Sequence, residues 1–418
     1  MNIEQLPQQR SHRLHPFILL AAFLSTFSIG LMSPILPTLV EQYGGNAFTI
    51  GMLFSSYSFA QFLSAPTLGA ISDRYGRRVV ILVSLCVAIF GFSLFAVGGS
   101  LWALFLGWMI VGLADCWIGS SFSYVADVTE SNDRTRYFAF LSAAIGAGFI
   151  VGPATSGFFS RYSPATPLHI LIALLIFAAI WGYFSMPESL PPEQRATSLQ
   201  FSHLNPLTQL RNIVQFPQLR LLLLSFLLFW TIVMVPSANL PSLLSDRLNW
   251  SPEQISPLFI IFGVIDVSVQ LVILPLLLRR FREIRLAILG GVMAGFAFFL
   301  LGLFPLTGTL QLVYIAMVVF SIGQPIVQTC LTGTMSKSMG SSMQGRVQGS
   351  IAAVMAIAQV IGPSWAGWLY QSVSPSAPYW AAAIQALVAV AIMLFARSRL
   401  KRLNHKYRAI HDEAIYYR

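Results

Sequence analysis

Two carboxylates lie within long apolar stretches of this chain, and they are the residues best suited to chemistry. Of 15 acidic residues, only Asp115 and Asp266 lie well inside such stretches. A carboxylate in a membrane interior costs about 2.5–3.5 kcal/mol on insertion scales and is a functional-site hypothesis by default. Low dielectric disfavours its charged form, so it can load a proton when it faces water and release it after the site re-orients. The alternative is a hydrogen-bonded acid that only fixes helix packing.

Helical spacing places an aromatic side chain with one acid and an amide with the other. Trp108 shares a helical face with Asp115, and Gln270 shares one with Asp266. Such stripes favour a substrate cavity, but small residues on the same faces equally suit close packing between membrane helices. Other mid-membrane polar or aromatic groups complete the candidate cavity: Gln61, Gln324, Gln328, Gln359 and Trp230.

Twelve apolar stretches must position these residues. The chain has 418 residues, of which 56% are hydrophobic and 10% charged, whereas soluble domains carry roughly 25% charged residues. Each stretch is close to or above the roughly 20 residues that a membrane-spanning helix needs, and strands of a membrane barrel would be only about 10 residues long. All are therefore predicted as helices: 16–40, 49–70, 79–98, 101–126, 137–159, 168–183, 221–240, 257–278, 286–303, 310–332, 347–369 and 378–395.

The net charge of +10 is explained by membrane topology and does not require a nucleic-acid partner. If the N-terminus is cytoplasmic, all of the 25 Lys and Arg residues except Arg161 and Arg247 lie in cytoplasmic segments. This asymmetry is the positive-inside rule. It predicts an integral protein of the bacterial cytoplasmic membrane with both termini in the cytoplasm.

The chain divides near its midpoint into two sets of six predicted spans. A GPxxxG sequence occurs in the fifth span, at Gly152, and in the eleventh, at Gly362, and indicates an internal repeat. In the connecting segment, Asn205 and Pro206 precede spaced apolar residues and predict a short amphipathic helix on the inner membrane surface. The predicted parts, in chain order, are a first bundle at 1–186, a linker at 187–220, a second bundle at 221–396 and a basic cytoplasmic tail at 397–418.

Residues 69–78, with the sequence GAISDRYGRR, lie between the second and third predicted spans. They resemble the GxLaDrxGrr signature of the major facilitator superfamily, and the resemblance covers essentially the whole chain. A glycine-rich stretch in the fifth span is similar to the motif of the twelve-span drug/proton antiporters, and residues 344–349 resemble the tetracycline-efflux branch in particular. The resemblance implies an all-α membrane protein with twelve helices in two pseudo-symmetric six-helix bundles.

The antiporter-like stretch would let the fifth span approach a neighbouring helix closely and bend. Its residues are Gly146, Gly148, Gly152, Pro153 and Gly157. A bendable helix fits rocking of one half against the other. A static packing role is the alternative.

Residues 69–78, which we call the charged signature, are predicted to act as a gate together with Asp127. Asp127, at the inner end of the fourth span, is placed to pair with Arg77. Asp73 can accept hydrogen bonds from the positive N-terminus of a neighbouring helix, which the resemblance implies is the helix that begins near Val347. The predicted gate residues are Gly69, Asp73, Arg74, Gly76, Arg77, Arg78 and Asp127. The alternative is that the arginines only set the membrane topology.

Departures from the family pattern bear on the substrate. Trp108 stands where the family's fourth span has an arginine. Ser25 stands where the tetracycline branch has a first-span acid, and the ninth span has no acid at all. Tetracycline is therefore not the expected substrate.

These features predict a secondary active transporter that exports a small lipophilic or amphiphilic compound in exchange for protons by alternating access, with Asp115 as the preferred proton carrier. The chain has no GxxxxGK(S/T) or HExxH motif, so we expect a gradient as the energy source and no enzyme activity, cofactor or metal. The expected partners are the substrate, protons and the lipid bilayer, and the protein is expected to be a monomer. The alternatives are an uncoupled facilitator or nutrient importer, and a membrane sensor that does not transport.

Overall fold

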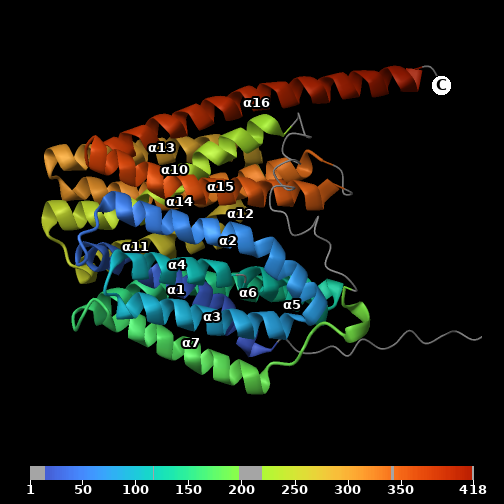
Figure 1. The fold of residues 1–418 in the computed structure, drawn as a ribbon. Helices are drawn as coiled ribbons and strands as arrows, with labels where there is room; N and C mark the ends of the chain where they lie inside the picture. The colour runs from blue at the N-terminus through green and yellow to red at the C-terminus, as the bar shows by residue number, and fades with distance from the viewer. Residues whose placement is uncertain (1–14, 116, 197–218, 340–342, 417–418) are drawn as a thin grey trace, which may run out of the picture. The chain divides into compact units, whose positions relative to one another are not determined.

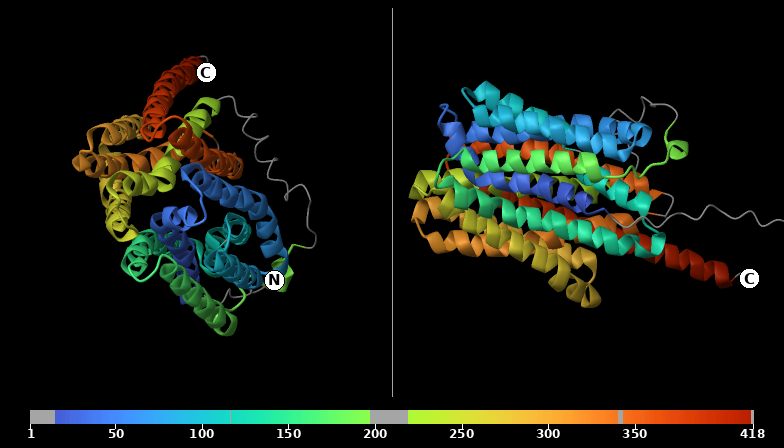
Figure 2. Two further views of the ribbon diagram at one scale, coloured as in Figure 1. Left: turned by 60° about the vertical axis from the view of Figure 1, so that its left-hand side comes forward. Right: turned by 90° about the horizontal axis from the view of Figure 1, so that it is seen from below.

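Long helices make up nearly all of the described chain. The computed structural model describes residues 15–115, 117–196, 219–339 and 343–416, and these residues contain no strand. They belong to two compact units, one of Met1–Ile35 with Ala60–Asn205 and the other of Leu36–Phe59 with Pro206–Arg418. Within each unit the long helices run alongside one another (Figures 1 and 2). The predicted all-α fold is confirmed.

The first half of the chain forms seven α-helices and a short 3₁₀-helix among its described residues. They are α1 (Pro16–Glu41), α2 (Ala47–Tyr75), α3 (Arg77–Val97), α4 (Leu101–Ala114), α5 (Trp117–Val128), α6 (Ser131–Ser160), α7 (Thr166–Ser185) and η1 (Pro192–Gln194). The predicted fourth span is divided between α4 and α5, and the predicted fifth span is α6. Within the first unit, α3 lies beside α4 and α7.

The second half begins its described helices after the linker. They are α10 (Arg220–Leu248), α11 (Pro252–Ser268), the π-helix η2 (Val269–Ile273), α12 (Leu274–Arg280), α13 (Glu283–Thr307), α14 (Leu310–Lys337), α15 (Gln344–Ser372) and α16 (Ala377–Tyr416). The predicted eighth span is the continuous run of α11, η2 and α12. Within the second unit, α13 lies between α14 and α16, and α10 lies beside α15 and α16.

Eleven helical segments in the described part of the chain are long and apolar enough to cross a membrane. The remaining predicted span, 49–70, lies in α2, which has 29 residues. This helix carries several serines, two threonines and Gln61. The polar content of α2 is the first structural sign that one of its faces serves something other than lipid.

Facing glycines bring helices together in each unit. A Cβ added at Gly91 in α3 would lie 2.8 Å from the carbonyl oxygen of Gly107 in α4. In the second unit, a Cβ added at Gly290 in α13 would lie 2.6 Å from the carbonyl oxygen of Gly323 in α14. Neither position has room for a side chain, so backbone packs against backbone, as is common between membrane helices.

Glycines also allow residues 36–59, which belong to the second unit, to pack closely against the rest of that unit. A Cβ added at Gly51 would clash with the Pro363 carbonyl group of α15, and one added at Gly367 would lie 2.5 Å from the Ala47 carbonyl oxygen. Ser55 Oγ donates a 3.0 Å hydrogen bond to Ser364 Oγ. The N-terminal half of α2 and the GPxxxG segment of α15 therefore form one close contact inside this unit.

Two further predictions concern the linker and the C-terminal tail. The predicted amphipathic helix after Asn205 lies outside the described residues. The predicted basic tail is helical up to Tyr416, as part of the 40-residue helix α16 that begins at Ala377 (Figure 1). The predicted division into bundles at 1–186 and 221–396 stays a prediction.

Candidate functional site

Asp115 lies at a break in the predicted fourth span. The helix α4 ends at Ala114, and α5 begins at Trp117. Asp115 itself has φ −79° and ψ 72°, which is not helical, and its backbone N–H donates to the Gly112 carbonyl at 3.3 Å. A helix end leaves backbone carbonyls without helical partners, so polar side chains are needed beside this break.

Side chains from α1 and α2 supply those partners. Ser25 Oγ donates to Asp115 Oδ1 at 2.9 Å, and Gln61 Nε2 donates to Asp115 Oδ2 at 3.0 Å. Gln61 Nε2 also lies 3.3 Å from the Asp115 carbonyl oxygen. Ser25 is 1% exposed, and the other two residues are half-buried. We call Ser25, Gln61 and Asp115 the Asp115 cluster, and all three residues belong to the first unit.

The chemistry of the Asp115 cluster suits a carboxyl group that changes its protonation state. A hydroxyl is both a donor and an acceptor, whereas an ionised carboxylate only accepts and a protonated one also donates. Ser25 can therefore keep its hydrogen bond to Asp115 in either state by turning its proton. Sequence reasoning found Asp115 and Gln61 separately and noted Ser25 only as a departure from a family pattern.

Asp266 occupies a second polar position, at the end of α11 and next to the π-helix η2. Its Oδ2 accepts a 2.8 Å hydrogen bond from Gln270 Nε2, so the predicted pair is in contact. Its Oδ1 is buried without a hydrogen-bond partner among the described residues. Short π-helical segments inside α-helices occur often at functional sites. Asp266 is thus a half-buried carboxylate whose buried Oδ1 has no hydrogen-bond partner among the described residues, at an irregular point of its helix.

The predicted amides of α14 lie near this region. Gln324 Nε2 donates to Gln328 Oε1 at 3.1 Å, and Gln324 is buried. Helix α14 lies beside α11, where the rings of Phe262 and Phe320 stack with their centroids 6.0 Å apart. Asp266 and Gln324 each follow one of these two rings by four residues, which is about one helical turn.

The other predicted cavity residues have packing contacts. Trp108 is buried, and its ring centroid lies 6.1 Å from that of Phe92 and 5.6 Å from that of Phe95, both in α3. Trp230 stacks on Phe226 within α10 at 5.7 Å, and its Nε1 is buried without a hydrogen-bond partner among the described residues. Gln359 is half-buried in α15. The cavity roles of Trp108, Trp230 and Gln359 stay predictions.

Arg77 is the centre of the charged signature. Its Nη1 lies 2.6 Å from Asp73 Oδ1 and 3.1 Å from Ser72 Oγ, and its Nε lies 3.2 Å from Asp127 Oδ2. The predicted pairing of Arg77 with Asp127 is therefore present, and it joins α3 to α5. Asp73 and the helix at Val347 belong to different units, so their predicted contact stays a prediction.

The neighbouring arginines have different partners. Arg78 Nη2 donates to the Tyr183 carbonyl oxygen at 2.6 Å, which joins α3 to α7. The guanidinium carbon of Arg74 lies 5.4 Å from the Tyr75 ring centroid. A Cβ added at Gly69 would meet nothing within 4 Å, so nothing in the described structure requires a glycine there.

Glu188 is a functional candidate that sequence reasoning missed. It lies just after α7, and its Oε1 accepts from the Arg77 backbone N–H at 2.8 Å while its Oε2 accepts from that of Arg78 at 3.2 Å. The carboxylate thus caps the N-terminus of α3, where anions are favoured. Gly76 has φ +105°, and a Cβ there would clash with the Glu188 carboxylate. No spacing signal pointed to Glu188, because it lies in a proline-rich segment without periodicity.

The segment that follows Glu188 is also bound to the charged signature. Ser189 Oγ donates to Asp127 Oδ2 at 3.0 Å, and the Ala196 backbone N–H donates to the Asp73 carbonyl at 3.0 Å. Tyr124 of α5 donates its hydroxyl proton to the Pro187 carbonyl at 3.4 Å. Residues 187–196 therefore hold α2, α3 and α5 together at this end of the first unit.

The antiporter-like glycines of α6 face α1. A Cβ added at Gly148 would lie 2.5 Å from the Phe23 carbonyl oxygen, and one added at Gly152 would lie 2.5 Å from the Phe27 carbonyl oxygen. Thr26 Oγ1 donates to the Ile145 carbonyl of α6 at 2.8 Å. Close approach of this helix to a neighbour is thus observed, and its bending during function stays a prediction, as do the roles of Gly146, Pro153 and Gly157.

Known proteins share this sequence pattern and fold. The family model described as Major Facilitator Superfamily matches residues 18–363. The chain is 30% identical over 344 residues to the tetracycline resistance protein, class C, of Escherichia coli, which is 81% of this chain and 85% of that protein. It is 27% identical over 391 residues to the quinolone resistance protein NorA of Staphylococcus aureus, which is 91% of this chain and 97% of that protein.

A solved structure shares the fold at low sequence identity. A mutant of the nucleoside transporter NupG is similar with a TM-score of 0.76 and 14% identity, over 91% of this chain and 99% of that chain. At this identity the likeness concerns the fold alone. The curated relatives cover most of the chain from end to end, so they bear on both units.

Proposed function

Because the chain belongs to the Major Facilitator Superfamily, it is an integral inner-membrane transporter of small molecules and not an enzyme, and we propose that it exports a lipophilic or amphiphilic compound in exchange for protons. Alternating access between two membrane faces is the proposed mechanism. We further propose that both termini are cytoplasmic, as the distribution of Lys and Arg indicates, and that the transporter is a monomer.

The Asp115 cluster is the observation that carries this proposal. Asp115 lies at the α4–α5 break, with Ser25 and Gln61 on its two carboxylate oxygens. An ionisable group deep in a membrane bundle is retained mainly for function. The hydroxyl of Ser25 and the amide of Gln61 are neutral, so neither of these two hydrogen bonds is an ion pair that would have to break when Asp115 gains a proton. These contacts support a proton carrier better than a purely structural acid.

The charged signature supports the alternating-access part of the proposal. Arg77 links Asp73 on α2 with Asp127 on α5, and Glu188 fixes the start of α3 beside them. Ion pairs that are partly exposed to water are individually weak, so such a cluster can open and reform during a transport cycle. We propose that it holds the cytoplasmic side closed in one state and separates in the other.

Names of relatives support the choice of substrate class. The relatives are called resistance proteins for tetracycline and quinolones, and both words describe small amphiphilic molecules. We extend only that class to this chain. The absence of a first-span acid, with Ser25 in its place, still argues against tetracycline itself.

Proton coupling is tested by replacing the carboxylate. In everted membrane vesicles that hold an imposed pH gradient, Asp115→Asn should lose the dissipation of the gradient that an added substrate triggers. Glu193→Gln, which changes an exposed acid of η1, should behave as the wild type. The assay needs a panel of lipophilic and amphiphilic compounds, because the substrate is chosen by its response in the wild type.

A parallel variant separates the two membrane carboxylates. If Asp266→Asn abolishes coupling and Asp115→Asn does not, the proton carrier is Asp266 and the proposal for Asp115 is wrong. If both variants transport with unchanged coupling, neither carboxylate carries the proton. Flux in liposomes at several pH values completes the test, since pH-independent flux identifies an uncoupled facilitator and no flux with any compound identifies a sensor.

A further inference from the structure

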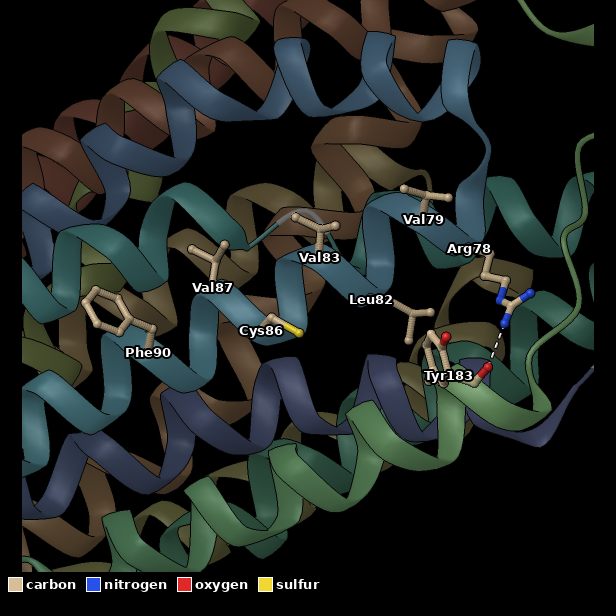
Figure 3. Close-up of a pocket in the computed structure, with 8 residues that line it drawn as sticks. All are labelled: Arg78, Val79, Leu82, Val83, Cys86, Val87, Phe90 and Tyr183. Atoms are coloured by element: carbon tan, nitrogen blue, oxygen red, sulfur yellow. Dashed lines mark hydrogen bonds between the residues drawn. The ribbon is translucent and has the colours of Figure 1, made fainter.

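An elongated groove runs along the outer side of α3 in the first unit. Its volume is about 720 Å³. Figure 3 shows its lining side chains in a row along α3, with Tyr183 of α7 at one end. The lining residues are Arg78, Val79, Leu82, Val83, Cys86, Val87, Phe90 and Tyr183. None of them belongs to the Asp115 cluster.

The groove is apolar along its length and cationic at one end. Val79, Val83 and Phe90 are 49%, 55% and 62% exposed, so the apolar wall is open to the surroundings of the helix. Arg78 lies at the N-terminal end of α3, next to Tyr183. An apolar track that ends in a cation matches an amphiphile with a hydrocarbon chain and an anionic head.

Arg78 keeps its charge available for such a head. A guanidinium carries five N–H donors, and Arg78 Nη2 donates to the Tyr183 carbonyl oxygen. Arg78 forms no ion pair with any carboxylate in the part of the chain that the structure describes. The nearby Glu188 carboxylate is occupied by backbone N–H groups, those of Arg77, Arg78, Ser189 and Leu190. The remaining donors of the Arg78 guanidinium can bind a phosphate, for which arginine has the right geometry.

The length of the groove fits the acyl chain of a membrane lipid. The rise per residue in an α-helix is about 1.5 Å, so the distance along α3 from Arg78 to Phe90 is roughly 18 Å. One leaflet of the hydrocarbon core is roughly 15 Å thick, half of the roughly 30 Å total. With Arg78 at the level of the headgroups, the apolar wall therefore extends over the depth of one leaflet.

We propose that this groove binds a phospholipid with an anionic headgroup, with one acyl chain along Val79, Val83 and Phe90 and the phosphate at Arg78. Basic side chains at membrane surfaces attract anionic lipids by about 1 kcal/mol each, and direct bidentate contact adds to this attraction. The bound headgroup would lie next to Arg77, which forms ion pairs with Asp73 and Asp127. The lipid is then a resident part of the α3–α7 surface.

Native mass spectrometry of the full-length protein in detergent tests the headgroup contact, with phosphatidylglycerol and phosphatidylcholine as probes. Wild-type protein should retain phosphatidylglycerol in preference, and Arg78→Gln should weaken that binding by about tenfold, the effect of one charge-assisted hydrogen-bonded contact. Arg78→Lys should bind more tightly than Arg78→Gln and less tightly than the wild type, because it keeps the positive charge and loses the bidentate contact. Arg136→Gln removes an exposed arginine of α6 that does not line the groove, and it should bind like the wild type. Equal retention of both lipids, or equal losses in Arg78→Gln and Arg136→Gln, would overturn the proposal.

Photo-crosslinking tests the chain position in wild-type protein, so the result does not depend on any variant folding. A phosphatidylglycerol with a diazirine on its acyl chain is added to liposomes that contain the transporter. Crosslinks should concentrate between Val79 and Phe90, and unlabelled phosphatidylglycerol should compete with them while phosphatidylcholine should not. Crosslinks spread evenly over other exposed helices, or competition by both lipids, would show that the groove is ordinary lipid-facing surface.

Discussion

The Ser25 hydroxyl donates a 2.9 Å hydrogen bond to the Asp115 carboxylate, joining the middle of α1 to the break between α4 and α5. Ser25 stands where the resembling tetracycline branch carries an acid in its first span. In this chain the carboxylate beside that position comes from the fourth span instead.

Removal of the Ser25 hydroxyl should impair coupling. Ser25→Ala leaves one Asp115 oxygen without its partner in both protonation states, so substrate-driven proton movement should fall by about tenfold, as expected for one hydrogen bond to a charged group. Proton flux in everted vesicles is the measurement. Ser28→Ala is the matched control, because within the described part of the chain Ser28 Oγ bonds only to the Ser25 carbonyl of its own helix, at 2.7 Å. Similar losses in the two variants would mean that Ser25 matters for packing and not for Asp115.

Glu188 should contribute measurably to stability. Glu188→Ala removes the carboxylate that caps the N-terminus of α3, and loss of a helix cap costs about 0.5–2 kcal/mol. Thermal unfolding of the purified protein in detergent should show a lower midpoint. Glu193→Ala, in the same segment but exposed, should leave the midpoint unchanged. The capping role is excluded if the two variants unfold at the same temperature.

The two glycines of the charged signature should differ in their tolerance of alanine. Gly76 has φ +105°, and a Cβ there would run into Glu188, whereas a Cβ at Gly69 would meet nothing within 4 Å. Gly76→Ala should therefore cost about 1–3 kcal/mol of stability, and Gly69→Ala should cost little. Thermal unfolding of the two variants side by side is the test. A stable Gly76→Ala variant would show that the segment at Glu188 can move aside.

The α1–α6 contact should be sensitive to a single methyl group. Gly148→Ala places a Cβ against the Phe23 carbonyl oxygen and the Thr26 hydroxyl, and overpacking of this kind costs about 1–3 kcal/mol. Gly119→Ala in α5 adds the same methyl group where nothing lies within 4 Å. Yield and thermal stability in detergent should fall for Gly148→Ala only. A fall in both variants would point to a general requirement for glycine and not to this contact.

His15, just before α1, should make stability depend on pH. Burial lowers the pKa of His15 below its ordinary value of 6.5, and Nδ1 accepts a 3.3 Å hydrogen bond from the Phe17 backbone N–H, which needs the neutral ring. The unfolded chain thus binds the proton more readily, so the contribution is present above pH 6.5 and is lost as the pH falls below it. His15→Asn keeps an acceptor without the titration. The unfolding temperature should drop less between pH 7.5 and 5.5 in this variant than in the wild type, and an equal drop would exclude His15.

Hydropathy predicted the fold because its signal is long and repeated. A run of about 20 apolar residues leaves a helix as the only structure that pairs its backbone in lipid, and this holds whichever neighbours the helix has. The Arg77–Asp127 pair was predictable because both residues lie on the same predicted side of the membrane. Arg77 comes just before the third predicted span, and Asp127 comes just after the fourth.

Local interruptions were not predictable from the pattern. The break at Asp115 has no proline, and apolar residues continue on both sides of it, so the stretch 101–126 has the composition of one helix. The Ser25 contact is 90 residues distant in sequence, and Glu188 reaches Arg77 across 111 residues. Contacts of this kind depend on how helices are rotated about their axes, and composition does not determine that rotation.

The π-helix at Val269–Ile273 changes the direction in which the later residues of its span face. A π-turn holds one residue more than an α-turn would, and each residue turns an α-helix by about 100°. The seven residues from Leu274 to Arg280 therefore face a direction that a regular helix drawn from Asp266 would not assign to them. Deleting a single residue between Val269 and Ile273 would therefore restore a uniform α-helix and leave Arg279 and Arg280 on the side of the span that they already occupy.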